Sequence, residues 1–154
     1  MDDAVDVEAA RRAFEQAVGD HAPAFERFFL ARMLGLTFDY TDTSCEIRFP
    51  VHDFLYNPQG SLHGGIIALV LDVSMGHLLN KVVGGPGTTM EMKTQYFAPV
   101  RTPSARAVSG FLHRGRRVAY MEAKLFDANG TLAAAASSTW MILKPPAERP
   151  PAGG

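Results

Sequence analysis

The sequence predicts an α+β domain in which a curled antiparallel sheet wraps around one buried helix. In the segment 62–80, apolar residues cover almost the whole circumference of a helix, which is typical of a buried one. Much of the chain from residue 36 onward alternates apolar and polar residues with the period of strands. Turn sequences separate several of these strands, which favours antiparallel neighbours. Because a helix that is apolar all round needs cover on every side, we expect the sheet to curl around it.

Residues 1–35 are expected to form a helical extension. Apolar residues between Val7 and Val18 recur at spacings of three and four, and a second short helix is expected over 24–34. After Gly35 the period changes to two, which predicts a first hairpin over residues 36–51.

Four strands are expected after the central helix, over 88–98, 104–113, 118–127 and 131–143. The last segment conflicts with intrinsic propensity, because its alanines favour a helix. The Asn129-Gly130 turn before it predicts a hairpin partner, and we therefore expect a strand. The predicted organisation is a helical extension over 1–35, one sheet domain over 36–144 and a disordered Pro/Gly-rich tail over 145–154.

The composition excludes several classes of protein. Among 154 residues, 15 Lys+Arg against 16 Asp+Glu leave a formal charge of −1, so no broad basic field exists for nucleic acid or anionic lipid. The single Cys45 excludes an intramolecular disulfide and a cysteine-based zinc site, and the histidines lack metal-ligand spacing, so no metal is predicted. With no signal peptide and no uninterrupted apolar run of about 18 residues, we expect a cytoplasmic protein without a membrane span.

Asp72 is the first candidate for chemistry, because it lies in the middle of the apolar helix. An ionised carboxylate in such surroundings is costly unless it is paired or hydrogen-bonded. A structural hydrogen bond or a solvent-facing cleft would explain it, but perturbed carboxyl groups gather at functional sites. We favour a catalytic role for Asp72.

Gly64 and Gly65 open the same helix, although glycine is a poor helix former. Bare backbone would let a ligand approach closely, and the free N–H groups of a first helical turn can bind a carbonyl oxygen. Clearance for tight packing of the helix on the sheet would explain the glycines equally well. The spacing alone leaves both readings open.

The run Asn57-Pro-Gln-Gly-Ser-Leu-His63-Gly64-Gly65, followed by Asp72 and Gly76, resembles the hotdog-fold acyl-CoA thioesterases of the phenylacetate-pathway (PaaI-like) type. The resemblance continues through residues 96–99 and 115–117 and covers roughly residues 35–143. It implies a sheet wrapped around a long helix, a homodimer and commonly a dimer of dimers. It also implies hydrolysis of acyl-CoA thioesters without metal or separate cofactor, because CoA is part of the substrate.

The same resemblance implies roles for individual residues. The Gly64 N–H and Asn57 would polarise the thioester carbonyl, and Asp72 would act as general base or nucleophile. His63 would hold Asn57, and a strand hydroxyl, best matched by Thr89 and next by Thr88, would assist the water. The further substrate-contacting positions are Gly65, Thr88, Arg114, Arg116, Arg117 and Ser138, with the arginines near the CoA nucleotide. For the arginines, an exposed hairpin with solubilising charges is the competing interpretation.

Geometry independently predicts where such a site would lie. Gly64 and Asp72 are eight residues apart, which is about 12 Å along a helix axis. Since reacting groups must lie within about 3–3.5 Å, both can act on one thioester only if they come from different subunits. We therefore expect two equivalent sites at a two-fold interface.

Other functions of this fold remain in competition. One is a non-catalytic acyl-CoA-binding module, which has no need of a buried carboxylate beside the thioester. A second is the hydroxybenzoyl-CoA type of thioesterase, which carries glutamate at the position of Asp72. A hydratase is less favoured, because its Asp/His pair belongs to a different motif.

Overall fold

The computed structural model describes residues 5–143. The predicted disordered tail, 145–154, lies outside the described residues. The elements in chain order are α1 (Val7–Asp20), α2 (Phe29–Met33), β1 (Thr37–Tyr40), β2 (Ser44–Pro50), the short 3-10 helix η1 (Asp53–Leu55), α3 (Gly64–Val83), β3 (Gly87–Tyr96), β4 (Ser104–Arg114), β5 (Val118–Asp127) and β6 (Leu132–Ile142).

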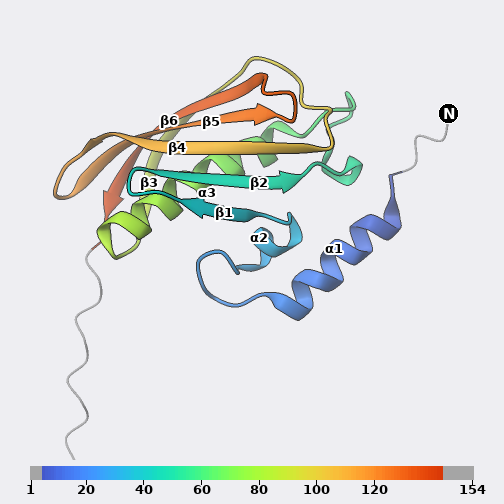
Figure 1. Cartoon of the computed structure of the whole chain (residues 1–154), viewed down its shortest axis with the longest axis horizontal. Helices are drawn as coiled ribbons and strands as arrows, with labels where there is room; N and C mark the ends of the chain where they lie inside the picture. Colours follow the sequence, from blue (N-terminus) through green and yellow to red (C-terminus); the bar gives the residue numbers. More distant parts are fainter. Residues whose placement is uncertain (1–4, 144–154) are drawn as a thin grey trace, which may run out of the picture.

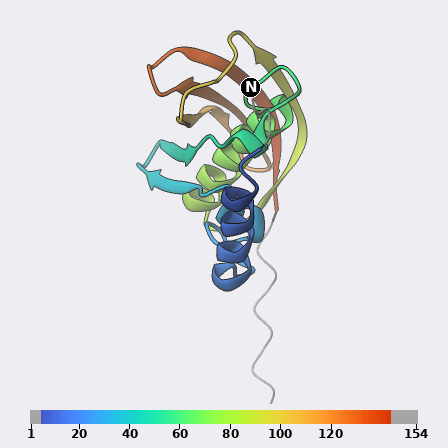
Figure 2. The same ribbon diagram turned by 90° about the vertical axis from the view of Figure 1, so that its right-hand side faces the viewer.

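The strands form one six-stranded antiparallel sheet in the order β1-β2-β4-β5-β6-β3 (Figure 1). Seen along its length, the sheet curves around α3, while α1 and α2 pack against each other outside it (Figure 2). This confirms the predicted hotdog arrangement. The order leaves β3 and the short β1 at the two edges of the sheet.

Helix α3 is defined by caps at both ends. The His63 side chain accepts a hydrogen bond from the Gly65 N–H, and Gly84 closes the helix in the left-handed conformation with φ 69°. The predicted bounds of 62–80 were therefore slightly early. Leu62 is instead held in an isolated antiparallel bridge with Tyr56, which delays the start of the helix.

The apolar character of α3 follows from its packing. Its sheet-facing side chains are fully buried, among them Val70, Leu71, Met75, Leu78 and Leu79. On another face, Ile66, Leu69 and Val73 are only partly buried. Within residues 5–143, α3 is also the one helix long and apolar enough to cross a membrane. Its place in the core of the sheet accounts for that composition.

Strand β6 confirms the prediction made against helix propensity. It lies between β5 and β3, and its Ala133, Ala134 and Ala136 are buried. Hydrogen bonds to β5 on one side and β3 on the other pair its backbone groups. This pairing overrides the intrinsic preference of alanine for a helix. Small inward side chains also suit a strand that lies directly against the helix layer.

The predicted second helix over 24–34 was wrong in its first half. Helix α2 begins only at Phe29, because the chain before it turns through Glu26, which has a left-handed φ of 64°. The Glu26 N–H donates to Nε2 of His77 on α3 at 3.1 Å. The His77 ring stacks on the Phe38 ring, with 4.5 Å between the ring centroids. A tertiary contact therefore replaces the helical turn and ties the N-terminal extension to α3.

Gly76 lies where α3 and the sheet approach each other closely. A Cβ at this position would lie 2.9 Å from Cη2 of Trp140, whose side chain is buried. We expect Gly76→Ala to lower the free energy of unfolding by about 1–3 kcal/mol, measured by urea unfolding. Gly19→Ala in α1 is the control, since a Cβ there meets nothing within 4 Å. Equal stability of the two variants would contradict the close packing.

Candidate active site

The carboxyl group of Asp72 is held by a strand hydroxyl. Asp72 is partly buried on α3, and the Thr89 hydroxyl of β3 donates to its Oδ1 at 2.8 Å. Burial raises the pKa of Asp72 above the ordinary aspartate value, and the Thr89 hydrogen bond opposes this with a smaller effect. Thr88, the second candidate hydroxyl, is exposed. Because neighbouring strand residues point to opposite faces, Thr88 points away from the face on which Thr89 contacts Asp72.

A β-bulge lies beside this contact. The pairing of β3 with β6 shifts between Thr89 and Glu91, so that Thr89 faces Trp140 while Glu91 faces Thr139. Bulges redirect side chains and occur frequently next to active sites. The irregularity therefore coincides with the strand residue that holds Asp72.

In the first turn of α3, the Gly64 N–H has no acceptor among residues 5–143. The Gly65 N–H donates to His63 Nδ1 at 2.9 Å, and the N–H groups of Ile66 and Ile67 donate to the His63 carbonyl at 2.9 and 3.2 Å. Among the hydrogen bonds of residues 5–143, none has the Gly64 N–H as donor. This N–H lies at the positive end of the helix dipole, where a carbonyl oxygen or oxyanion is stabilised.

Asn57 lies near the same end of the helix. Asn57 and Gly64 both line a pocket of about 350 Å³, together with Tyr96 and residues 97–100. The Asn57 Oδ1 accepts hydrogen bonds from the N–H groups of Gln59 and Ser61, at 2.9 and 3.3 Å. The loop thus fixes the side chain of Asn57 beside the start of α3.

His63 is placed differently from its expected role. Its side chain caps α3 through Gly65, and a Cβ at Gly65 would lie 3.1 Å from His63 Nδ1. The hydrogen bonds between described residues include none from His63 to Asn57. In this chain His63 therefore orders the helix start, and glycine at position 65 makes room for its ring.

The tyrosine at the end of β3 had no role assigned from the sequence. The Tyr96 hydroxyl donates to the Gly64 carbonyl at 2.9 Å. No periodicity or spacing marks such a contact, because it joins residues 32 positions apart. Only the fold brings them together.

The Gly64 and Asp72 positions lie at opposite ends of β3. The row of paired residues through Thr89 continues across the sheet to Trp140, Ala119 and Arg114. The row through Tyr96 crosses different residues, Ala134, Leu125 and Ala107. Asp72 is absent from the lining of the Asn57–Gly64 pocket. Within one chain, Asp72 and Gly64 therefore lie in separate places.

The arginine cluster lies at the Asp72 end of the sheet. Arg114 shares the row of Thr89, and the Ile142 N–H donates to the Arg117 carbonyl at 2.8 Å. Arg114, Arg116 and Arg117 are exposed, and the ion pairs between described residues include none of them. Their charge is available to an anionic ligand.

Ser138, another predicted substrate contact, is buried. Its hydroxyl donates to the Glu91 carbonyl at 2.7 Å. In this chain the side chain of Ser138 ties β6 to β3 beside the bulge.

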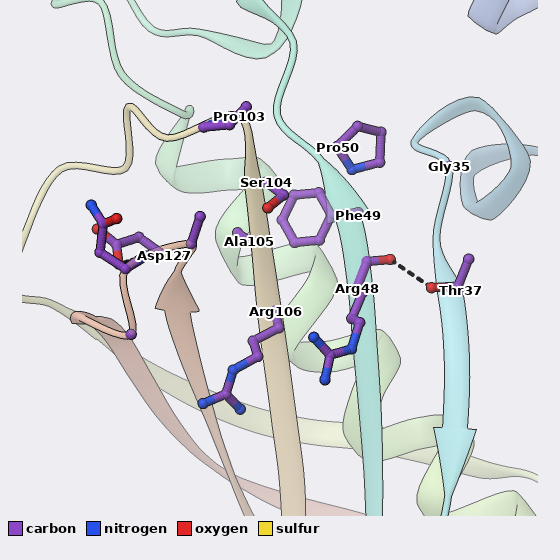
Figure 3. A pocket seen from close by; sticks show the side chains of 13 residues that line it. Gly35, Thr37, Arg48, Phe49, Pro50, Pro103, Ser104, Ala105, Arg106 and Asp127 are labelled. Carbon is purple, nitrogen blue, oxygen red and sulfur yellow. Dashed lines mark hydrogen bonds between the residues drawn. The ribbon is translucent and has the colours of Figure 1, made fainter.

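A pocket larger than the one shared by Asn57 and Gly64 lies away from these residues. It measures about 650 Å³ and includes none of the predicted site residues. Arg48 and Arg106 extend into it from neighbouring strands (Figure 3), and both pair with the Glu46 carboxylate. Because Glu46 already neutralises part of their charge and Asp72 is elsewhere, pocket size does not identify the candidate site.

No candidate metal centre is found in the described part of the chain, 5–143. There, no three His, Cys, Asp or Glu side chains are grouped so that they could hold a metal ion. That the chain needs no cofactor stays a prediction.

A comparison with protein families matches residues 59–134 to the Thioesterase superfamily. The matched segment, residues 59–134, belongs to this superfamily. The matched region contains the start of α3, Asp72, Thr89 and the arginine hairpin. The chain is accordingly a hydrolase of the thioesterase class.

Known proteins are similar to the chain in fold or in sequence. A Bacillus halodurans protein whose crystal structure was determined with CoA is 24% identical with a TM-score of 0.75, covering 88% of this chain and 94% of that one. A Haemophilus influenzae thioesterase is 18% identical with a TM-score of 0.67, covering 71% and 79%. A Sulfurisphaera tokodaii protein, provisionally named an esterase, is 24% identical over 116 residues, covering 75% of this chain and 87% of its own length.

The raised pKa of Asp72 determines how this residue changes the free energy of unfolding with pH. The fold disfavours the ionised carboxyl, so wild type loses free energy of unfolding as pH rises from the ordinary aspartate range through the raised pKa. Asp72→Asn cannot ionise but can still accept the Thr89 hydrogen bond. We expect its stability relative to wild type to increase with pH over that range, in urea unfolding between about pH 4 and about pH 8.

Thr89→Val provides the matching comparison. The substitution removes the hydrogen bond that lowers the Asp72 pKa. As pH rises, the free energy of unfolding of Thr89→Val should therefore fall by more than that of the wild type. A stability difference between Asp72→Asn and wild type that stays constant at every pH would contradict the perturbed carboxyl.

Proposed function

We propose that the chain is an acyl-CoA thioesterase that hydrolyses a small or medium acyl-CoA or an aryl-CoA to the free acid and CoA. The observation that carries this proposal is the pair of groups on α3. The partly buried Asp72 carboxyl is held by Thr89, and the Gly64 N–H has no acceptor among the described residues. Hydrolysis of a thioester needs a base or nucleophile and a donor for the developing oxyanion.

The Gly64 N–H would bind the thioester carbonyl oxygen. Its hydrogen bond strengthens as that oxygen gains negative charge in the tetrahedral intermediate, and one such donor typically contributes about 10²–10³ in rate. Asn57 lines the same pocket and supports this position as the electrophilic side of the site.

Asp72 would act on the other side of the carbonyl. As a general base it takes a proton from water, whose oxygen then attacks the carbonyl carbon. The intermediate collapses by breaking the C–S bond, and the electron pair leaves on the CoA sulfur, which is then protonated. As a nucleophile, Asp72 would instead form an anhydride with release of CoA, and water would hydrolyse it. Both routes need the ionised carboxyl, and a raised pKa makes it a stronger base.

The two groups require two copies of the chain. Their spacing of about 12 Å on one helix is too large for one carbonyl. Strand β3 supports pairing of two chains, because it is a ten-residue edge strand whose outer backbone groups can pair with another strand. Met90 on it and Phe97 just beyond it are 55% and 56% exposed, which favours burial in a dimer. Following the resemblance, such dimers would pair into a tetramer.

The arginine cluster is the proposed contact for the CoA phosphates. Guanidinium groups match phosphate oxygens with paired hydrogen bonds, and Arg114, Arg116 and Arg117 are exposed at the Asp72 end of the sheet. The structure of the Bacillus halodurans protein with CoA supports this class of substrate. A cytoplasmic location is part of the same proposal.

Asp72→Asn tests the reaction in a thiol-release assay over a panel of acyl-CoAs and aryl-CoAs. Asparagine cannot take a proton from water, so we expect kcat/KM to fall by about 10²–10⁴-fold. Asp39→Asn, at an exposed position of β1, should retain the wild-type rate. The wild-type kcat/KM should also decrease as pH falls through the raised pKa of Asp72.

Two results would overturn the proposal in different ways. If Asp72→Asn folds, binds CoA esters and hydrolyses them at the wild-type rate, the mechanism is wrong. If the wild type binds CoA esters tightly and releases no thiol from any of them, the chain is a binding module.

A further inference from the structure

We propose that Tyr96 is a positioning residue that fixes the Gly64 backbone for binding of the thioester carbonyl. This inference rests on the proposed function. Its basis is a double contact between the end of β3 and the start of α3. The Tyr96 hydroxyl donates to the Gly64 carbonyl at 2.9 Å, and its ring lies where a Cβ on Gly64 would touch it.

The ring contact is close enough to require glycine or a small displacement of the ring. A Cβ at Gly64 would lie 3.3 Å from Cε1 and 3.4 Å from Cζ of Tyr96. Both explanations for a glycine at this position therefore apply, because the residue packs closely against a strand side chain and leaves its backbone open to a ligand. Tyr96 occupies one side of Gly64, while the N–H on the preceding peptide has no acceptor among the described residues.

The exposure of Tyr96 points to positioning more than to stability. Its side chain is 52% exposed and lines the pocket that Gly64 and Asn57 share. A single hydrogen bond of this kind contributes only modestly to folding, because water can replace it. Its main effect is to hold a solvent-facing backbone segment in one orientation at the proposed electrophilic side.

Strand β3 thereby contacts both functional positions of α3. Thr89 holds Asp72 at one end of the strand, and Tyr96 holds Gly64 at the other. Because these contacts are made by one strand of the same chain, they fix where α3 presents each group relative to the sheet edge. In a dimer paired through β3, Tyr96 would set the distance between Gly64 and the carboxyl of the other copy.

Tyr96→Phe tests this role, because it keeps the ring and removes only the hydroxyl. We expect kcat to fall about 10-fold, since small displacements of a reacting geometry reduce the rate strongly, while KM for the CoA ester stays within about 2-fold. Tyr120→Phe is the matched control. It is 49% exposed on β5, and the hydrogen bonds of residues 5–143 include none from its hydroxyl.

A structural measurement accompanies the kinetics. The backbone amide signal of Gly64 in a ¹H–¹⁵N spectrum should shift in Tyr96→Phe and stay in place in Tyr120→Phe. Equal kcat of the two variants, in a protein that Asp72→Asn inactivates, would overturn the role of Tyr96 and leave the proposed function intact. A wild type without thiol release refutes the proposed function and the catalytic role together. An unmoved Gly64 signal refutes the positioning contact in either case.

Discussion

The rigid spacing of two groups on α3 is the constraint on which the proposed active site depends. Gly64 and Asp72 lie eight residues apart on one helix, and the sheet holds that helix along its buried face. Neither group can move toward the other without breaking the helix or its packing. In the proposed mechanism each chain therefore supplies half of two sites, and pairing of copies brings the halves together.

Strand β3 connects this constraint to the surface of the molecule. It lies at the edge of the sheet, it holds Asp72 through Thr89 and it holds Gly64 through Tyr96. The proposed chemistry and the proposed pairing of chains thus involve the same strand. The partly buried carboxyl reduces stability when it is ionised, which is consistent with a group retained for reactivity and not for folding.

The sequence predicted features that depend on long patterns and missed those that depend on single tertiary contacts. The apolar circumference of α3 and the alternation of the strands were sufficient for the fold, and the turn at Asn129-Gly130 correctly outweighed the alanines of β6. The start of α2 was missed because Glu26 bonds to His77 in place of forming a helical turn. Among site residues, family resemblance pointed to Thr89 as a hydroxyl that assists the water, and the structure shows its contact with Asp72. The contact of Tyr96 with Gly64 leaves no pattern in the sequence.

The shared site is tested most directly by mixing two inactive chains. Gly64→Pro removes the N–H at the first helical position, where proline is tolerated, and His63 already has the extended backbone that proline requires before it. Gly64→Ala, which keeps the N–H, separates the loss of this donor from the crowding of the Tyr96 ring by a Cβ. In Gly64→Pro/Asp72→Asn heterodimers one of the two sites is intact, so random exchange should restore about a quarter of the wild-type activity. Folded, demonstrated heterodimers that stay inactive would contradict a site built from two chains.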